Sequence, residues 1–185
     1  PGPSREPRPA EVPARVEPAT EHATGRDFVI DPERDTLGQG SPREKAHRNL
    51  DVLRLLKRLE TEGRLAGADE QKILVGYTGW GGLKQVFADY SPEKWHREVQ
   101  QALRDLLTPA EYSAAQATVL NAHYTSAPVI QGMWDAVKRL GADRGRILEP
   151  SMGAGHFFGL QPTAAAARSQ RVGVEIDLLT GRIAA

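Results

Sequence analysis

The 185-residue chain contains no cysteine. This excludes a disulfide framework, a thiolate nucleophile and any zinc or iron–sulfur site with sulfur ligands, and it fits a reducing compartment such as the cytoplasm. A long hydrophobic run is absent as well, because the longest stretch without Asp, Glu, Lys or Arg, residues 112–134, contains polar residues such as Asn121, His123 and Thr125. We therefore expect a cytoplasmic protein with no membrane partner.

Charge of one sign is not in excess either, since 24 Lys and Arg balance 24 Asp and Glu. This balance excludes a histone-like, purely charge-driven nucleic-acid binder, so any contact with nucleic acid has to come from a local patch. With 39% hydrophobic and 6% aromatic residues, the composition is that of an ordinary globular chain. Its length suits one domain or slightly more.

Residues 1–26 hold six prolines among alternating charges and almost no large apolar side chain. Such a composition buries too little to offset the entropy of ordering, and it predicts a disordered leader. The chain does not begin with Met and shows no signal peptide, while residues 180–185 are typical of the opening of a helix, so we expect a piece of a longer protein. The apolar run 28–30 predicts a small strand or an anchoring segment.

Residues 27–120 are predicted to form a helical region. Ser41 followed by Pro42 is typical of a helix start, and the apolar stripe that follows continues to a stop at Gly63. The outward face of this helix is basic, which is more typical of a solvated face than of a phosphate-contacting one. Three further helices are expected: from Ala68 to the glycine at 76, from a cap at Ser91-Pro92, and from a capping box at Thr108 and Glu111 to Leu120.

The segment 76–82 contains four glycines around Trp80 and cannot be the interior of a helix. Trp80 is either an aromatic platform for a nucleic-acid base or a plug that seals a tight turn into the core. We favour the plug, because no cluster of Lys or Arg adjoins it, as stacking platforms usually require.

From residue 121 the pattern changes to that of an α/β fold. A helix from 127 to Gly141 is followed by a strand at 146–150, a glycine turn, a short helix and a second buried strand at 171–177. This order predicts the first βαβ unit of a doubly wound, Rossmann-like sheet. Since two strands are an incomplete sheet of this type, we expect exposed apolar strand residues.

The glycine turn lies where open α/β sheets bind their ligands, at the carboxyl end of the first strand. Glu175 comes twenty residues after Gly155, at the end of the second strand, where a carboxylate can accept both hydroxyls of a ribose. Glu149-Pro150 directly before the turn disfavours a dinucleotide, and with it an NAD-type oxidoreductase. An acid at this place suits a ligand with an ammonium or sulfonium group.

These residues resemble a known family. The runs 147–157 and 173–177 are similar to the first two cofactor motifs of S-adenosylmethionine-dependent, adenine-specific DNA methyltransferases. Residues 123–128 resemble the Tyr-Thr-Pro-like segment that these enzymes place before the first strand, with two residues inserted before the proline. Segments 79–83 and 180–184 are similar to the amino-terminal part of very large phage and plasmid proteins that fuse such a methylase to a helicase, including antirestriction proteins.

The resemblance implies that residues 121–185 begin a truncated S-adenosylmethionine-binding methyltransferase domain. The implied cofactor residues are Thr125, Glu149, Pro150, Gly153, Gly155, Glu175, Ile176 and Asp177. By this likeness Thr125 holds the methionine carboxylate, Glu149 faces the methionine ammonium, and the two glycines admit the cofactor. The alternatives are Thr125 or Ser126 as a helix cap and Glu149 as a surface acid at a strand end.

The same resemblance implies that Glu175 binds the ribose and that Ile176 lies against the adenine ring. Asp177 either joins this site or merely caps the following helix. Glu175 also has an alternative, as a salt-bridge partner. Taken together, three motifs in order favour the cofactor site over these alternatives.

The Asn/Asp-Pro-Pro-aromatic box that aligns the target adenine in this family is absent, so the sequence offers no catalytic residue. Two hypotheses follow. The chain is the cofactor-binding part of a DNA adenine methyltransferase, fused to a helicase and with DNA as a partner through the longer protein. Alternatively, it is a non-catalytic interaction or antirestriction module that uses a methylase-like fold as a scaffold.

Overall fold

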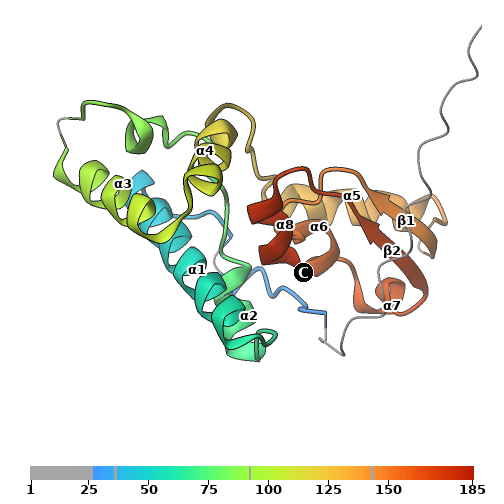
Figure 1. The fold of residues 1–185 in the computed structure, drawn as a ribbon. Helices are drawn as coiled ribbons and strands as arrows, with labels where there is room; N and C mark the ends of the chain where they lie inside the picture. Colours follow the sequence, from blue (N-terminus) through green and yellow to red (C-terminus); the bar gives the residue numbers. More distant parts are fainter. Residues whose placement is uncertain (1–26, 36, 92, 143) are drawn as a thin grey trace, which may run out of the picture.

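The computed structural model describes residues 27–35, 37–91, 93–142 and 144–185, and the predicted leader 1–26 lies outside them (Figure 1). Its longest helix, α1 (Pro42–Glu62), has the predicted bounds. The Ser41 hydroxyl accepts a bond from the Glu44 amide while the Glu44 carboxylate accepts one from the Ser41 amide, and Gly63 ends the helix in the left-handed conformation. Both ends are therefore set by local hydrogen bonds.

The other elements of the helical region are α2 (Ala68–Leu74), the 3₁₀ helix η1 (Lys84–Phe87), α3 (Lys94–Leu106), α4 (Pro109–Ala117) and the 3₁₀ helix η2 (Thr118–Leu120). Helices α2 and α3 pack against α1, while η1 and α4 pack against α3 and η2 packs against α4. Figure 1 shows α1 and α3 side by side. The predicted capping box of Thr108 and Glu111 is present at the start of α4.

The predicted cap at Ser91 is wrong. Helix α3 begins at Lys94, and its N-cap Glu93 makes no side-chain capping bond. Ser91 is buried and its hydroxyl is bonded to the His96 Nδ1, while its carbonyl accepts a bond from Arg97. A hydroxyl engaged by a ring on the helix is not free to bond the open amides of the first turn.

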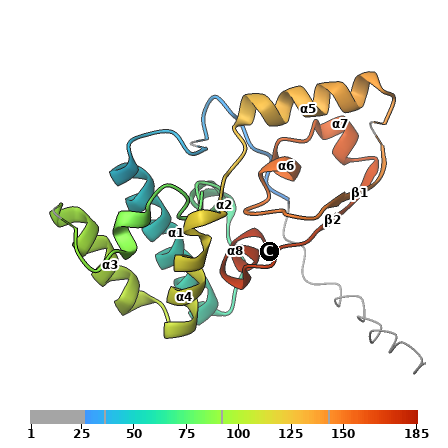
Figure 2. The ribbon, with the colours of Figure 1, turned by 90° about the horizontal axis from the view of Figure 1, so that it is seen from above.

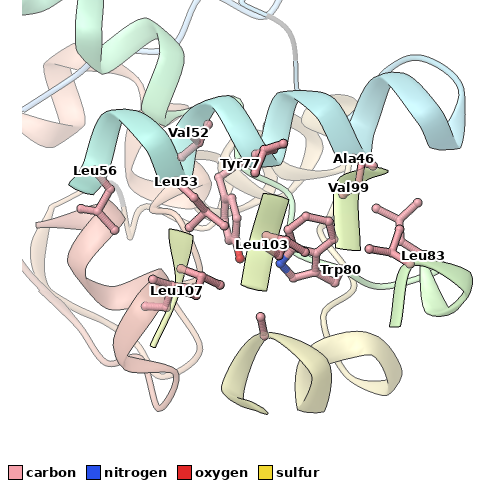
Figure 3. Close-up of a cluster of buried hydrophobic side chains, with 14 of the residues drawn as sticks. Ala46, Val52, Leu53, Leu56, Tyr77, Trp80, Leu83, Val99, Leu103 and Leu107 are labelled. Atoms are coloured by element: carbon pink, nitrogen blue, oxygen red, sulfur yellow. The ribbon is translucent and has the colours of Figure 1, made fainter. Parts of the chain in front are cut away.

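Trp80 is fully buried in the main hydrophobic core, so the plug interpretation is confirmed. Figure 3 shows its indole below α1, among the side chains of Val99, Leu103 and Leu83. The glycine-rich segment around it is held to α1 by Asn49, whose side chain donates to the Gly79 carbonyl and accepts from the Thr78 amide.

Residues 121–185 form a mixed α/β unit with a small parallel sheet. Its elements are α5 (Ala127–Arg139), β1 (Gly145–Glu149), α6 (His156–Gly159), α7 (Thr163–Ala166), β2 (Ser169–Gly173) and α8 (Leu178–Ala184). The strands pair in parallel from Gly145 with Ser169 to Glu149 with Gly173. The second strand ends four residues earlier than predicted, although the Val174 amide still donates to the Glu149 carbonyl at 2.9 Å.

The prediction of a buried second strand is wrong. Figure 2 shows α5, α6 and α7 on one side of the strands, and Ile147 packs on that side with the cluster of Ile130 and Trp134. In the part of the chain that the structure describes, no helix covers the opposite side, and Leu148 and Val172 are 63% and 48% exposed. Apolar strand residues are therefore exposed, as expected for two strands with one covered face.

The helical region and the α/β unit share the main core, because Leu179 and Ile183 of α8 pack with residues of α1 and α3. A second link is made by the segment 28–30. It forms no strand but is attached to the end of α6, because the Ile30 amide donates to the Gly159 carbonyl at 2.9 Å. The predicted division at residue 121 stays a prediction. None of the described helices is long and apolar enough to cross a membrane.

Glu111 joins three helices through its carboxylate. It accepts bonds from Lys57 of α1 at 2.6 Å, from Arg182 of α8 and from the Thr108 amide at the start of α4. Burial acts to raise the pKa of Glu111, but these bonds outweigh it and lower the pKa to about 2.

Candidate functional site

The glycine turn joins the carboxyl end of β1 to α6. Gly153 and Gly155 both lie in the left-handed region, with φ of 57° and 82°. Only glycine adopts this conformation without strain, and the Gly155 amide closes the turn on the Met152 carbonyl at 3.0 Å. The turn therefore needs the two glycines that the sequence places there.

The structure brings Glu175 to this turn, as the spacing predicts. Glu175 lies two residues beyond β2, and its carboxylate accepts bonds from the Gly153 amide at 2.8 Å and from the Asp177 amide at 2.9 Å. It is thus bonded to backbone amides rather than to a cation. Each carboxylate oxygen keeps a second acceptor position, so Glu175 is still able to accept a hydrogen bond from a ligand hydroxyl.

Tyr124 supports the turn from the helical side. A Cβ atom added at Gly153 would lie 3.3 Å from Cε1 of Tyr124, and one added at Gly79 would lie 3.2 Å from its Cε2. The ring therefore separates the glycine turn from the glycine-rich segment around Trp80. Burial raises the pKa of Tyr124, and the nearby Glu175 and Asp177 raise it further, so the phenol stays protonated.

The sequence interpretation covered the segment that contains Tyr124 but assigned this side chain no role. Its contacts are with residues 45 positions before it and 29 after it. No local pattern reveals such a contact. The sequence signal for this contact was weak: the chain has two separate glycine-rich turns, and an aromatic ring is able to pack against the backbone of each.

Glu149 and Thr125 lie at the margins of this arrangement. Glu149 is the last residue of β1, is half-buried, and accepts a bond from the Ser151 amide at 3.2 Å. Pro150 follows it and is exposed. Thr125 is exposed directly before Ser126, the N-cap residue of α5, and the Ser126 side chain makes no capping bond.

Ile176 and Asp177 have opposite surroundings although they are neighbours. Ile176 is 97% exposed. Asp177 is the N-cap of α8: its carboxylate accepts bonds from the Leu179 and Thr180 amides at 3.2 Å and from the Thr180 hydroxyl. This is the capping role that the sequence left open for Asp177, and it occupies the carboxylate.

His156 ties α6 to the helical region. Its ring is buried, and Nε2 donates to the Val75 carbonyl at 2.7 Å. Burial lowers the pKa of His156, so the imidazole is neutral near pH 7. The ring also lies 5.2 Å from that of Tyr124, between centroids. The glycine turn is thus backed by two rings that connect it to the helical region.

A hollow of about 810 Å³ lies near the turn, between the end of α1, α6 and α8. Of the predicted site residues only Gly155 lines it, and Glu149, Gly153 and Glu175 do not. This hollow therefore does not coincide with the predicted cofactor residues, which lie at the carboxyl ends of the strands. Among the described residues, no group of three His, Asp or Glu is arranged to hold a metal ion.

Comparison with known proteins gives one relative to report. The chain is 27% identical over 146 residues to the Defense against restriction protein B of Escherichia phage P1. The match covers 79% of this chain and only 5% of that protein. No protein-family model matches the chain, and no solved structure does. The predicted similarity to an antirestriction protein is thus confirmed, while the cofactor and its residues stay predictions.

Proposed function

We propose that this chain is a non-catalytic interaction module of an antirestriction protein, in which a methylase-like unit serves as a scaffold. The observation that carries this proposal is the match, over most of the chain, to a phage protein named for defence against restriction. The given sequence contains no Asn/Asp-Pro-Pro-aromatic box, so none of its residues is assigned the alignment of a target adenine.

The geometry also supports a stiff scaffold. The Glu175 carboxylate holds the glycine turn through the Gly153 amide, and Tyr124 packs between that turn and Gly79. A shared core and the bond from His156 to the Val75 carbonyl connect the two halves of the chain. Such a unit is able to present a fixed surface without any chemistry of its own.

To test this proposal, the reading frame that encodes this chain is expressed in a host with a restriction system. Survival of incoming unmodified DNA and the N6-methyladenine content of that DNA are measured together. Protection without N6-methyladenine supports the interaction module. Protection that appears only when adenine is methylated would refute it in favour of a methyltransferase.

A second candidate function is binding of S-adenosylmethionine as part of a DNA adenine methyltransferase fused to a helicase. The observation in its favour is the pair of parallel strands with a left-handed glycine turn after β1 and Glu175 just after β2. In this proposal Glu175 accepts the ribose hydroxyls and the exposed Ile176 covers the adenine. Thr125 binds the methionine carboxylate, and Glu149 faces the methionine ammonium.

Calorimetry with S-adenosylmethionine and with a simple adenosine thioether tests this second function. Glu175→Ala should weaken both ligands by about 1.5 to 3 kcal/mol, the scale of hydrogen bonds to a charged group. Glu149→Gln should weaken only the ligand that carries the amino acid portion. Glu98→Ala, an exposed carboxylate on α3, is the control and should change neither affinity. A preference for NAD over S-adenosylmethionine would exclude the methyltransferase reading.

A further inference from the structure

The end of the sheet opposite the glycine turn carries a concentration of positive charge. Lys138 and Arg139 are in the last turn of α5, Arg144 follows in the connection to β1, and Arg146 is the second residue of β1. All four are exposed, and we call them the basic rim. Figures 1 and 2 place the connection from α5 to β1 at the end of the molecule away from α8.

None of the four rim residues has an acidic partner among the described residues, in contrast to several, though not all, of the other cations. Lys57, Arg58, Arg64, Arg171 and Arg182 each lie within 4.0 Å of a carboxylate. Within the part of the chain that the structure describes, no ion pair involves any of the four rim residues.

A purely structural role explains only part of the rim. Cations in the last turn of a helix interact favourably with the helix dipole, which accounts for Lys138 and Arg139. It does not account for Arg144 and Arg146, which lie before and within a strand. The sequence near the rim offers Asp135, one turn earlier on α5, and Asp143, which lies outside the described residues. The four rim cations outnumber these two acids, and this local excess of positive charge favours an anionic partner.

The rim surrounds the start of β1 on both sides. Side chains alternate along a strand, so Arg146 lies on the same side as Leu148, opposite the side on which Ile147 packs under α5, and Arg144 directly precedes the strand. Lys138 and Arg139 belong to the helix that covers the other side. Three of the four charges thus belong to a helix or a strand, and Arg144 belongs to the loop that joins them.

The chemistry of the rim favours a double helix over unpaired bases. Three of its four residues are arginines, which bind phosphate oxygens through two parallel hydrogen bonds. Residues 135–148 contain no aromatic side chain on which an unpaired base could stack. A duplex presents its phosphates outward and its bases stacked inside, which matches a surface with cations and no aromatic platform.

We propose that the basic rim contacts the phosphate backbone of double-stranded DNA without reading its sequence. This contact lies at the amino ends of the strands, away from the glycine turn at the carboxyl end of β1. It is independent of any adenosine ligand at that turn. It also supplies the local patch that a chain of zero net charge needs in order to bind a polyanion.

The test is a fluorescence anisotropy titration of a labelled 20-base-pair DNA duplex at several KCl concentrations. The tested variant replaces Lys138, Arg139, Arg144 and Arg146 by Gln. The matched control replaces four other exposed cations by Gln: Arg34, Arg43, Lys84 and Lys94. Both variants lose the same charge, so a difference between them reports position and not net charge.

Four phosphate contacts give a log–log slope of affinity against salt of about −3.6. The rim variant should lose most of this slope and bind the duplex roughly tenfold more weakly or worse at 100 mM KCl, whereas the control should keep the wild-type slope. If the fourfold rim variant does not fold by circular dichroism, the pairs Lys138/Arg139 and Arg144/Arg146 are replaced separately, and each should lose about half of the slope.

Three outcomes overturn the proposal. One is no binding of the duplex by the unsubstituted chain at 50 mM KCl, and another is equal loss in the rim and control variants. The third is a partner of another kind: a single strand bound more tightly than the duplex, or vesicles of phosphatidylserine and phosphatidylcholine bound as well as the duplex.

Discussion

Replacing Trp80 by Ala should destabilise the protein by about 3 to 5 kcal/mol, as for other large buried aromatics. Trp80 is 0% exposed and lies in the main core, with the ring of Phe87 edge-on at 5.5 Å between centroids. Burial of about 200 Å² at roughly 25 cal/mol/Å² contributes about 5 kcal/mol, and the aromatic pair adds up to about 1 kcal/mol.

One feature of the site reduces this loss. The Trp80 Nε1 is buried and has no hydrogen-bond partner among the described residues. An unsatisfied buried donor costs about 1 to 3 kcal/mol, and its removal offsets part of the lost burial. Trp80→Phe, which keeps a ring and removes this donor, should therefore cost much less than Trp80→Ala.

The assay is urea unfolding followed by circular dichroism, because the other two tryptophans, Trp95 and Trp134, would complicate fluorescence. Tyr90→Ala is the control: this aromatic side chain is 83% exposed and its loss should change stability by less than about 0.5 kcal/mol. If Trp80→Ala left stability intact but weakened binding of single-stranded DNA, the side chain would be a base platform and the argument from burial would fail.

Gly81→Ala should lower the melting temperature by several degrees, whereas Gly132→Ala should keep or raise it, because a Cβ at Gly81 runs into the Ala122 carbonyl while one at Gly132 meets open space on a helix. Equal shifts in the two melting curves would contradict this. The pKa of Glu111 is lowered from 4.5 to about 2 on folding, so its contribution to stability is complete above pH 4.5 and disappears as the pH falls toward 2; Glu111→Gln should reduce this acid dependence in urea titrations. Burial lowers the pKa of His156 below 6.5, so an NMR titration of its ring should give a value below 6.5, and its stabilising effect, full above pH 6.5, should be lost as the pH falls through that value.

The sequence by itself determined the features that depend on neighbouring residues. The start of α1 follows from Ser41, Pro42 and Glu44, and its end from Gly63, because a helix end is satisfied by groups within four residues of it. The box at Thr108 and Glu111 was predictable for the same reason. The strand, glycine turn, helix and strand in order also followed from local patterns, since each is a matter of short-range periodicity and backbone freedom.

Only the tertiary structure decided which groups meet across the chain. It turned the Ser91 hydroxyl toward His96 and away from the first turn of α3. It placed Tyr124 between two glycine segments and bonded the Glu175 carboxylate to the Gly153 amide. The contacts of Tyr124 and Glu175 follow no sequence period, because contacts between distant segments depend on packing and not on spacing. Ser91 and His96 are only five residues apart, but both side chains are buried together.

The exposure of β1 and β2 was likewise not predictable from a local sequence pattern. Apolar residues such as Leu148 and Val172 are typical of buried strands, and the sequence predicted burial of the second strand. Whether a face is covered depends on how many elements lie against it, and among the described residues helices lie on one side of the sheet. Residue type sets the preference of a side chain for burial, but the arrangement of the surrounding elements decides whether that preference is met.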